Sequence, residues 1–81
     1  MIETIGFLEL NSIAKGIEAA DAILKAAEVD LIFAKPSCPG KYHVLFTGEV
    51  AAVKASLDAG AAVGGAHVVD QCVIPRVHPQ V

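Results

Sequence analysis

The segment Lys35-Pro36-Ser37-Cys38-Pro39-Gly40-Lys41 separates two strand-like runs, residues 30–34 and residues 42–46. Its two prolines restrict φ and remove two backbone donors, which makes the segment stiff. Gly40 can adopt the positive φ that a tight reversal often requires. We therefore predict that the segment is the tip of a β-hairpin, which joins the two strands and presents its thiol outward.

The hairpin tip carries one thiol, Cys38, with Lys35 and Lys41 close to it in the sequence. Positive charge near a thiol favours the thiolate, which is the form that binds metals or attacks electrophiles. One thiolate per chain is too few for a closed metal site. Cys38 is therefore either an ordinary turn cysteine or a residue that several symmetry-related chains bring together.

The length and composition predict one small domain, residues 1–81. A chain of this size buries only about 60–65% of the surface that its unfolded form exposes, so disulfides, a metal or oligomerisation usually add stability. Two cysteines do not make a disulfide framework, which favours reduced thiols in a cytosolic setting. The composition is 54% apolar and only 5% aromatic. Because alanine and valine supply much of this apolar content, we expect a homo-oligomer.

The charge pattern argues against nucleic acid and membranes as partners. The net charge is −3, and the six basic residues are spread along the chain without a basic patch. The longest uncharged stretch, residues 59–69, contains glycines and a histidine and does not read as a membrane span. The first residues are acidic where a signal peptide would be basic. No catalytic triad, paired carboxylates or phosphate-binding loop is present in the sequence, so we expect no enzymatic activity.

The hydrophobic pattern predicts four strands and two helices. The strands are expected at residues 5–10, 29–34, 42–47 and 67–74, and the helices at residues 13–27 and 48–65. In the first strand, alternation places Ile5 and Phe7 on one side and Leu8 and Leu10 on the other. Pro75 is expected to stop the last strand. The order β-α-β-β-α-β is typical of the ferredoxin-like α+β fold, in which two helices cover one face of a four-stranded antiparallel sheet. The other face is left for a subunit contact or for the C-terminal tail.

Each helix is expected to bury one apolar stripe. In the first helix the stripe consists of Ile13, Ile17, Ala20, Leu24 and Ala27, and in the second it consists of Val50, Val53, Leu57, Ala61 and Gly64. Asn11 and Ser12 offer oxygens that can cap the first helix, and Asp21 and Lys25 form a favourable i,i+4 pair. The residues 29–34 are expected to be buried on both faces of the sheet. We expect Cys72 to be a buried apolar residue rather than a ligand.

Several segments together resemble the bacterial microcompartment shell domain. Residues 5–10 and 20–27 resemble the opening of that domain, and residues 48–55 resemble the start of its second helix. The segment Val73-Ile74-Pro75-Arg76-Val77-His78-Pro79 resembles its closing motif, with Val77 in place of a proline. The resemblance implies a structural protein that forms a flat cyclic hexamer, or a trimer of tandem domains. These rings would tile with other shell proteins around enzymes, as a microcompartment in the bacterial cytoplasm.

The same resemblance implies roles for individual residues. The pore of the ring would be lined by Pro36, Ser37, Cys38, Pro39 and Gly40. The edge of the tile, where neighbouring rings meet, would carry Lys25 and Arg76. From the spacing alone, Lys25 is instead a solvated helix residue that pairs with Asp21.

The hairpin segment and residues 10–16 resemble the first half of tandem shell proteins of the propanediol-utilisation type. In those proteins one cysteine per subunit meets on a threefold axis and holds a [4Fe–4S] cluster. By that resemblance Cys38 is the ligand, and the cluster is shared between subunits and closes the pore. It would serve electron transfer across the shell or the delivery of a cluster to encapsulated redox enzymes. A trimer of tandem chains, of which these residues would be one half, would bring three thiolates together, whereas a hexamer of single domains would bring six.

Two other functions stay open from the sequence. The first is a plain shell tile whose pore passes small polar metabolites, with Cys38 unligated. The second is a small ferredoxin-like ligand-binding or regulatory domain that oligomerises without tiling.

Overall fold

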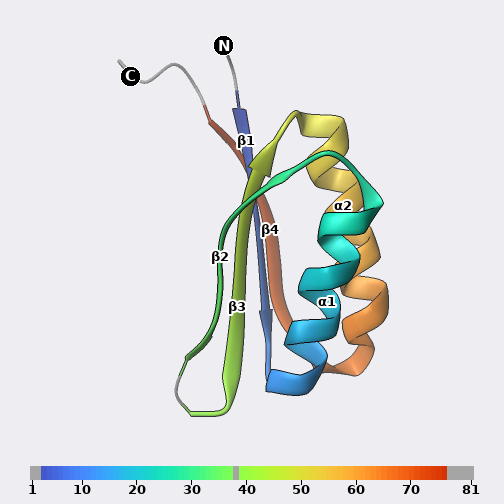
Figure 1. The fold of residues 1–81 in the computed structure, drawn as a ribbon. Coiled ribbons are helices and arrows are strands. Elements are labelled where there is room, and N and C mark those ends of the chain that lie inside the picture. Colours follow the sequence, from blue (N-terminus) through green and yellow to red (C-terminus); the bar gives the residue numbers. More distant parts are fainter. Residues whose placement is uncertain (1–2, 38, 77–81) are drawn as a thin grey trace.

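The structure is a computed structural model of the 81-residue chain, and it describes residues 3–37 and 39–76. The elements in chain order are β1 (Glu3–Leu10), α1 (Ile13–Ala26), β2 (Asp30–Ser37), β3 (Lys41–Gly48), α2 (Val50–Gly64), the 3₁₀ turn η1 (Gly65–His67) and β4 (Val68–Arg76). The strands form one sheet in the order β2-β3-β1-β4, and each neighbouring pair is antiparallel. Both helices cover the same face of this sheet (Figure 1). The predicted ferredoxin-like α+β fold is confirmed.

The core lies between the helices and the covered face of the sheet. Leu8 and Leu10 from β1 point into it, and so does Phe46 from β3; all three are fully buried. The alternation predicted for the first strand is confirmed, because Phe7 lies on the opposite face, where no helix covers it. We call this uncovered side the open face.

The predicted stripe of α2 is confirmed at Val53, Leu57 and Gly64, whereas that of α1 is confirmed only at Ala20. In α1 the buried residues are Gly16, Ala19, Ala20 and Ile23, and in α2 they are Val53, Ser56, Leu57, Gly60 and Gly64. Of the predicted stripe, Ile13, Ile17 and Leu24 are exposed by 42%, 56% and 44%. In α1 glycine and alanine take three of the four buried positions, since small residues allow close packing, and Ile23 takes the fourth.

α1 packs tightly against the sheet at Gly16, where an added Cβ atom would overlap the Tyr42 ring. We expect Gly16→Ala to lower the free energy of unfolding by about 1–3 kcal/mol, because the added methyl group overpacks this contact. Alanine favours helix by about 1 kcal/mol over glycine, so the contact must outweigh that gain. Chemical denaturation followed by circular dichroism measures the change, and a more stable variant would contradict the packing seen at Tyr42.

The prediction that residues 29–34 are buried on both faces is wrong, because β2 is an edge strand. Leu31 and Ile32 are exposed by 40% and 49%. The strand also continues through Pro36 and Ser37, which pair with Tyr42 and Lys41 of β3. The predicted loop from residue 36 to residue 40 is therefore shorter, and only residues 38–40 separate the two strands.

Two predictions for the last strand are also wrong. Cys72 is exposed, because β4 is the other edge of the sheet and Cys72 lies opposite Phe7 on the open face. Pro75 does not end the strand but pairs with Thr4 inside it. An edge strand can hold proline, since only one of its sides must supply backbone donors to a neighbour.

Candidate functional site at the β2–β3 hairpin

The hairpin predicted from the sequence is present. The last paired residues are Ser37 and Lys41, and Gly40 has a φ of 72°. This conformation confirms the need for glycine at the turn. Pro39 is exposed, and Cys38 lies outside the described residues. Figure 1 places the turn at the end of the sheet where α1 begins.

A cluster of side chains lies on the open face beside the hairpin. Lys41 Nζ lies 3.4 Å and His43 Nε2 lies 3.7 Å from the same carboxylate oxygen, Oε2 of Glu9. The His43 ring also packs against Phe7, with the ring centroids 5.5 Å apart. Lys35 Nζ lies 4.8 Å from the centre of the Phe33 ring. Glu9 therefore partly offsets the positive charge of Lys41, whereas the Lys35 charge stands over an aromatic ring.

Cys72 lies far from Ser37, the last residue of β2 before the hairpin turn. Ser37, next to Cys38, lies three strand spacings from β4, and the row of Cys72 lies four residues along the sheet from the row of Ser37. These offsets separate the two backbone positions by about 20 Å. Within residues 3–37 and 39–76, no three His, Cys, Asp or Glu side chains lie close enough together to hold a metal ion. A metal at the hairpin tip would need ligands from other chains.

The two residues predicted at the tile edge lie at the other end of the sheet. Lys25 is in the last turn of α1, 76% exposed, and the predicted pair is present with Lys25 Nζ 3.0 Å from Oδ2 of Asp21. Arg76 ends β4 opposite Glu3, the first residue of β1. Because α1 begins where β1 ends and runs back along the sheet, Lys25 and Arg76 share one end (Figure 1). The length of β2, about 25 Å, separates that end from the hairpin.

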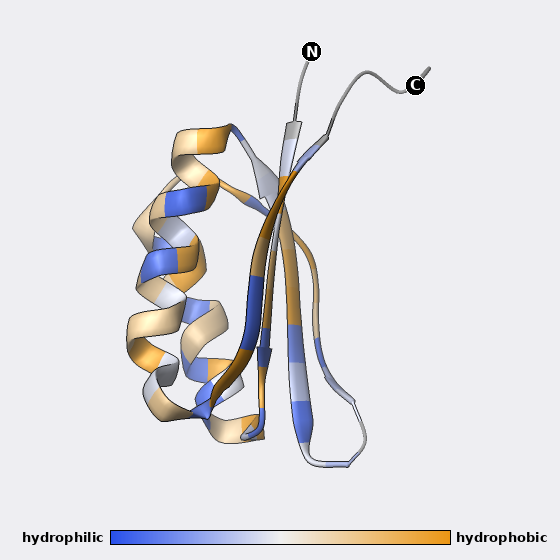
Figure 2. Ribbon diagram, turned by 180° about the vertical axis from the view of Figure 1, so that it is seen from behind, coloured by the Kyte–Doolittle hydropathy of each residue, from blue (hydrophilic) through white to orange (hydrophobic). Residues whose placement is uncertain are grey.

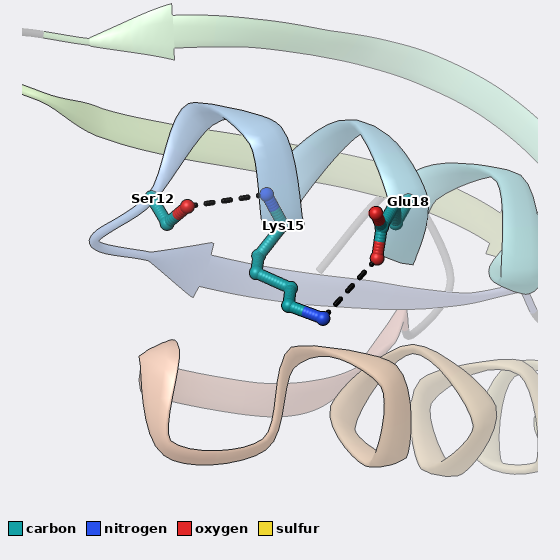
Figure 3. Close-up of polar contacts among 3 residues, drawn as sticks. All are labelled: Ser12, Lys15 and Glu18. Carbon is teal, nitrogen blue, oxygen red and sulfur yellow. Dashed lines mark hydrogen bonds and ion pairs between the residues drawn. The ribbon is translucent and has the colours of Figure 1, made fainter.

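Near the hairpin, Ser12 is the N-cap residue of α1, directly before Ile13. Its Oγ accepts a hydrogen bond of 3.2 Å from the Lys15 backbone N–H, as predicted for a helix cap. Lys15 Nζ in turn lies 3.3 Å from Oε1 of Glu18 (Figure 3). These local contacts stabilise the first turns of α1.

Two contacts at this site were missed by sequence reasoning. Asn11 does not cap the helix but donates its backbone N–H to the His67 carbonyl at 2.9 Å, and its Oδ1 lies 3.0 Å from His67 Nδ1. The pairing of His43 with Glu9 was missed as well. Both pairs join residues that are far apart in the sequence, so no local spacing could reveal them. The alternation of β1, which puts Glu9 on the open face, was the only signal.

In the part of the chain that the structure describes, neither helix has the length and apolar character needed to cross a bilayer.

Comparison with known proteins identifies the family. The BMC domain model matches residues 4–77. Bacterial microcompartment shell protein PduT of Citrobacter freundii is 46% identical over 81 residues, which cover 100% of this chain and 44% of PduT. Bacterial microcompartment shell protein PduA of the same organism is 42% identical over 83 residues, which cover 98% of this chain and 87% of PduA.

A solved structure agrees with these matches. The crystal structure of a microcompartment protein from Desulfitobacterium hafniense DCB has a TM-score of 0.93 and 59% identity, covering 99% of this chain and 44% of that one. The chain thus spans about half the length of PduT and of the Desulfitobacterium protein, and nearly the full length of PduA. Sequence, family model and fold agree over nearly the whole chain, and it belongs to the BMC domain family.

Proposed function

We propose that this chain is a structural shell protein of a bacterial microcompartment. Copies of it would close into a hexameric or pseudo-hexameric ring, and the rings would tile with other shell proteins around enzymes. The observation that carries the proposal is the BMC domain match over residues 4–77. The named relatives PduT and PduA are bacterial microcompartment shell proteins, and they match 100% and 98% of this chain.

The geometry of the sheet supports a ring. The hairpin lies at one end of the strands, and Lys25 and Arg76 lie at the other. If the strands radiate from a central axis, the hairpin turns gather at the centre and the other two residues face outward. Both edge strands also expose large apolar side chains, namely Leu31 and Ile32 on β2 and Val69 and Ile74 on β4. Exposed strand edges of this kind favour association with another chain.

We further propose that Cys38 residues converge on that axis and hold a [4Fe–4S] cluster between chains. The donor set supports this reading, because Cys38 directly follows Ser37 in the sequence, whereas Cys72 lies about 20 Å from Ser37 in the sheet. Thiolates are the usual ligands of iron–sulfur clusters. When bound, such a cluster would supply electron transfer across the shell or be passed to an enclosed redox enzyme. The residues around Cys38 would hold the thiol in place, since prolines flank it closely and Gly40 closes the turn.

Native mass spectrometry of protein purified without oxygen tests the ring and the cluster together. We expect one closed ring of a fixed number of chains, with added mass equal to one set of iron and sulfide. Negative-stain electron microscopy of the same sample should show extended sheets. A ring without added mass would leave a plain pore-bearing tile. Monomers that form no sheet would contradict the shell function and favour a ligand-binding or regulatory domain.

A further inference from the structure

A row of four polar side chains crosses the open face of the sheet. Lys35 on β2 lies opposite His43 on β3, His43 lies opposite Glu9 on β1, and Glu9 lies opposite Asp70 on β4. Directly opposite residues in antiparallel strands share a face of the sheet. The row therefore begins with a positive charge at one edge of the sheet and ends with a negative charge at the other.

The two middle members of the row are engaged within the chain, and the two outer members are not. Glu9 is held by Lys41 and His43, and its side chain is only 20% exposed. Lys35 and Asp70 are both exposed, and within residues 3–37 and 39–76 neither has an ion-pair partner. Each outer charge is thus available to a group beyond the edge of the sheet.

The same two edges expose apolar side chains. On β2, Leu31 and Ile32 are exposed by 40% and 49%, and on β4, Val69 and Ile74 are exposed by 50% and 49%. Figure 2 shows strongly hydrophobic segments within β4, on the edge of the sheet. Each edge therefore offers an apolar surface beside an outer charge of the row, and these two charges are opposite. The other charged residues of the edge strands, Asp30 and Arg76, lie outside the row at the end of the sheet away from the hairpin.

We propose that the β2 edge of one copy contacts the β4 edge of the next copy, and that Lys35 pairs with Asp70 of that neighbouring copy. This inference rests on the proposed ring. In a ring with the hairpin turns at the centre, residues of one row lie at one distance from the axis. Lys35 and Asp70 are in one row, so a head-to-tail contact brings them to the same radius.

The charge row also disfavours the competing contact. A twofold contact between two β2 edges centred on Lys35 would bring Lys35 toward Lys35, and one between two β4 edges centred on Asp70 would bring Asp70 toward Asp70. Like charges across an interface weaken it and suppress the wrong pairing. Only the head-to-tail contact joins unlike edges, and contacts of this type form a ring when the rotation between copies closes. The row thus favours the head-to-tail contact of the proposed ring over a twofold dimer.

Charge reversal in the 81-residue chain tests the pairing. We expect Lys35→Glu and Asp70→Lys each to raise the midpoint concentration for ring dissociation about tenfold, because attraction becomes repulsion at every contact of the ring. The double variant Lys35→Glu/Asp70→Lys restores the pair with its charges exchanged and should return the midpoint to within about threefold of the original. Analytical ultracentrifugation over a dilution series gives the midpoints, and circular dichroism confirms folding.

The matched control is the exposed pair Lys54 and Asp58 on α2, which lies on the helical side of the sheet. Reversal of either charge there should leave the midpoint unchanged. The pairing is overturned if the Lys35 and Asp70 variants behave like these controls, or if the double variant is no better than the single ones. An unmodified chain that forms no ring would overturn the proposed function as well, so the two failures are distinguishable.

Discussion

Replacing Cys38 with serine is expected to remove all cluster iron from the assembled protein. A serine hydroxyl does not replace a thiolate as an iron–sulfur ligand at neutral pH, and each chain would lose its one ligand at the axis. We expect iron and acid-labile sulfide to fall to background, and the visible absorption of the cluster to disappear. The ring itself should persist, because its contacts are proposed along the strand edges. Anaerobic native mass spectrometry measures both properties in one spectrum.

Cys72→Ser is the matched control for this change. It removes the same thiol group from an exposed position on β4, about 20 Å from the hairpin. Its iron content should equal that of the unmodified chain. Iron that persists in the Cys38→Ser protein, or that is lost from the Cys72→Ser protein, would refute Cys38 as the ligand. Absence of iron from the unmodified chain would refute the cluster and leave the plain pore-bearing tile.

Phe46→Ala is expected to destabilise the fold more than any other change considered. Phe46 is fully buried, and its ring lies across Gly6, where a Cβ atom would be 2.5 Å from Cζ of Phe46. Truncating a buried phenylalanine typically costs about 3–5 kcal/mol, because the packing around the cavity relaxes only in part. A domain of this size has a free energy of unfolding of about 4–12 kcal/mol. A large part of the total is therefore lost, and the midpoint of chemical denaturation should fall steeply.

The comparison for Phe46 is Phe33→Ala, the same truncation on the open face. Phe33 is half-buried and contacts the flexible side chain of Lys35. Its loss should cost the single chain about 1 kcal/mol or less. Both variants must be measured at one protein concentration, because subunit association adds to apparent stability. Equal losses for the two variants would contradict the placement of the core on the helix-covered face.

The sequence predicted the order of the elements because their local signals agree. Ser12 caps α1 and Gly65, with a φ of 54°, ends α2, and both were expected. The alternation of β1 separated Leu8 from Phe7 correctly. The hairpin with its positive-φ Gly40 was also predicted from the turn residues alone. Each of these features depends on a few adjacent residues, so the local sequence was sufficient to predict it.

The predictions that failed depended on position in the sheet. Ile32 and Cys72 lie in apolar runs, and an apolar run predicts burial. Sheet order places both on edge strands, and strand order is a long-range property. Similarly, Ile17 was assigned to the buried stripe of α1, but the neighbouring Gly16 is buried instead, because it lies directly against the Tyr42 ring. Hydropathy alone does not distinguish a buried core residue from an apolar residue that is exposed at the surface of the single chain.

Only the local features of the candidate site could be predicted from the sequence, because its other contacts depend on how the strands pair. The turn around Cys38 follows from local residues, and Lys25 pairs with Asp21 four residues earlier. The row from Lys35 to Asp70 spans all four strands, and its members become neighbours only through the sheet register. No regular spacing in the sequence relates these four residues, so the row could not be predicted from it.

The length of β2 has a consequence for how such proteins can diversify. Eight residues of strand, about 25 Å, separate the turn that holds Cys38 from the end that holds Lys25 and Arg76. Substitutions in the turn can therefore change the chemistry at one end while the other end keeps its shape. Rings whose turn residues differ would keep the same outer edge, so they could lie side by side within a single layer.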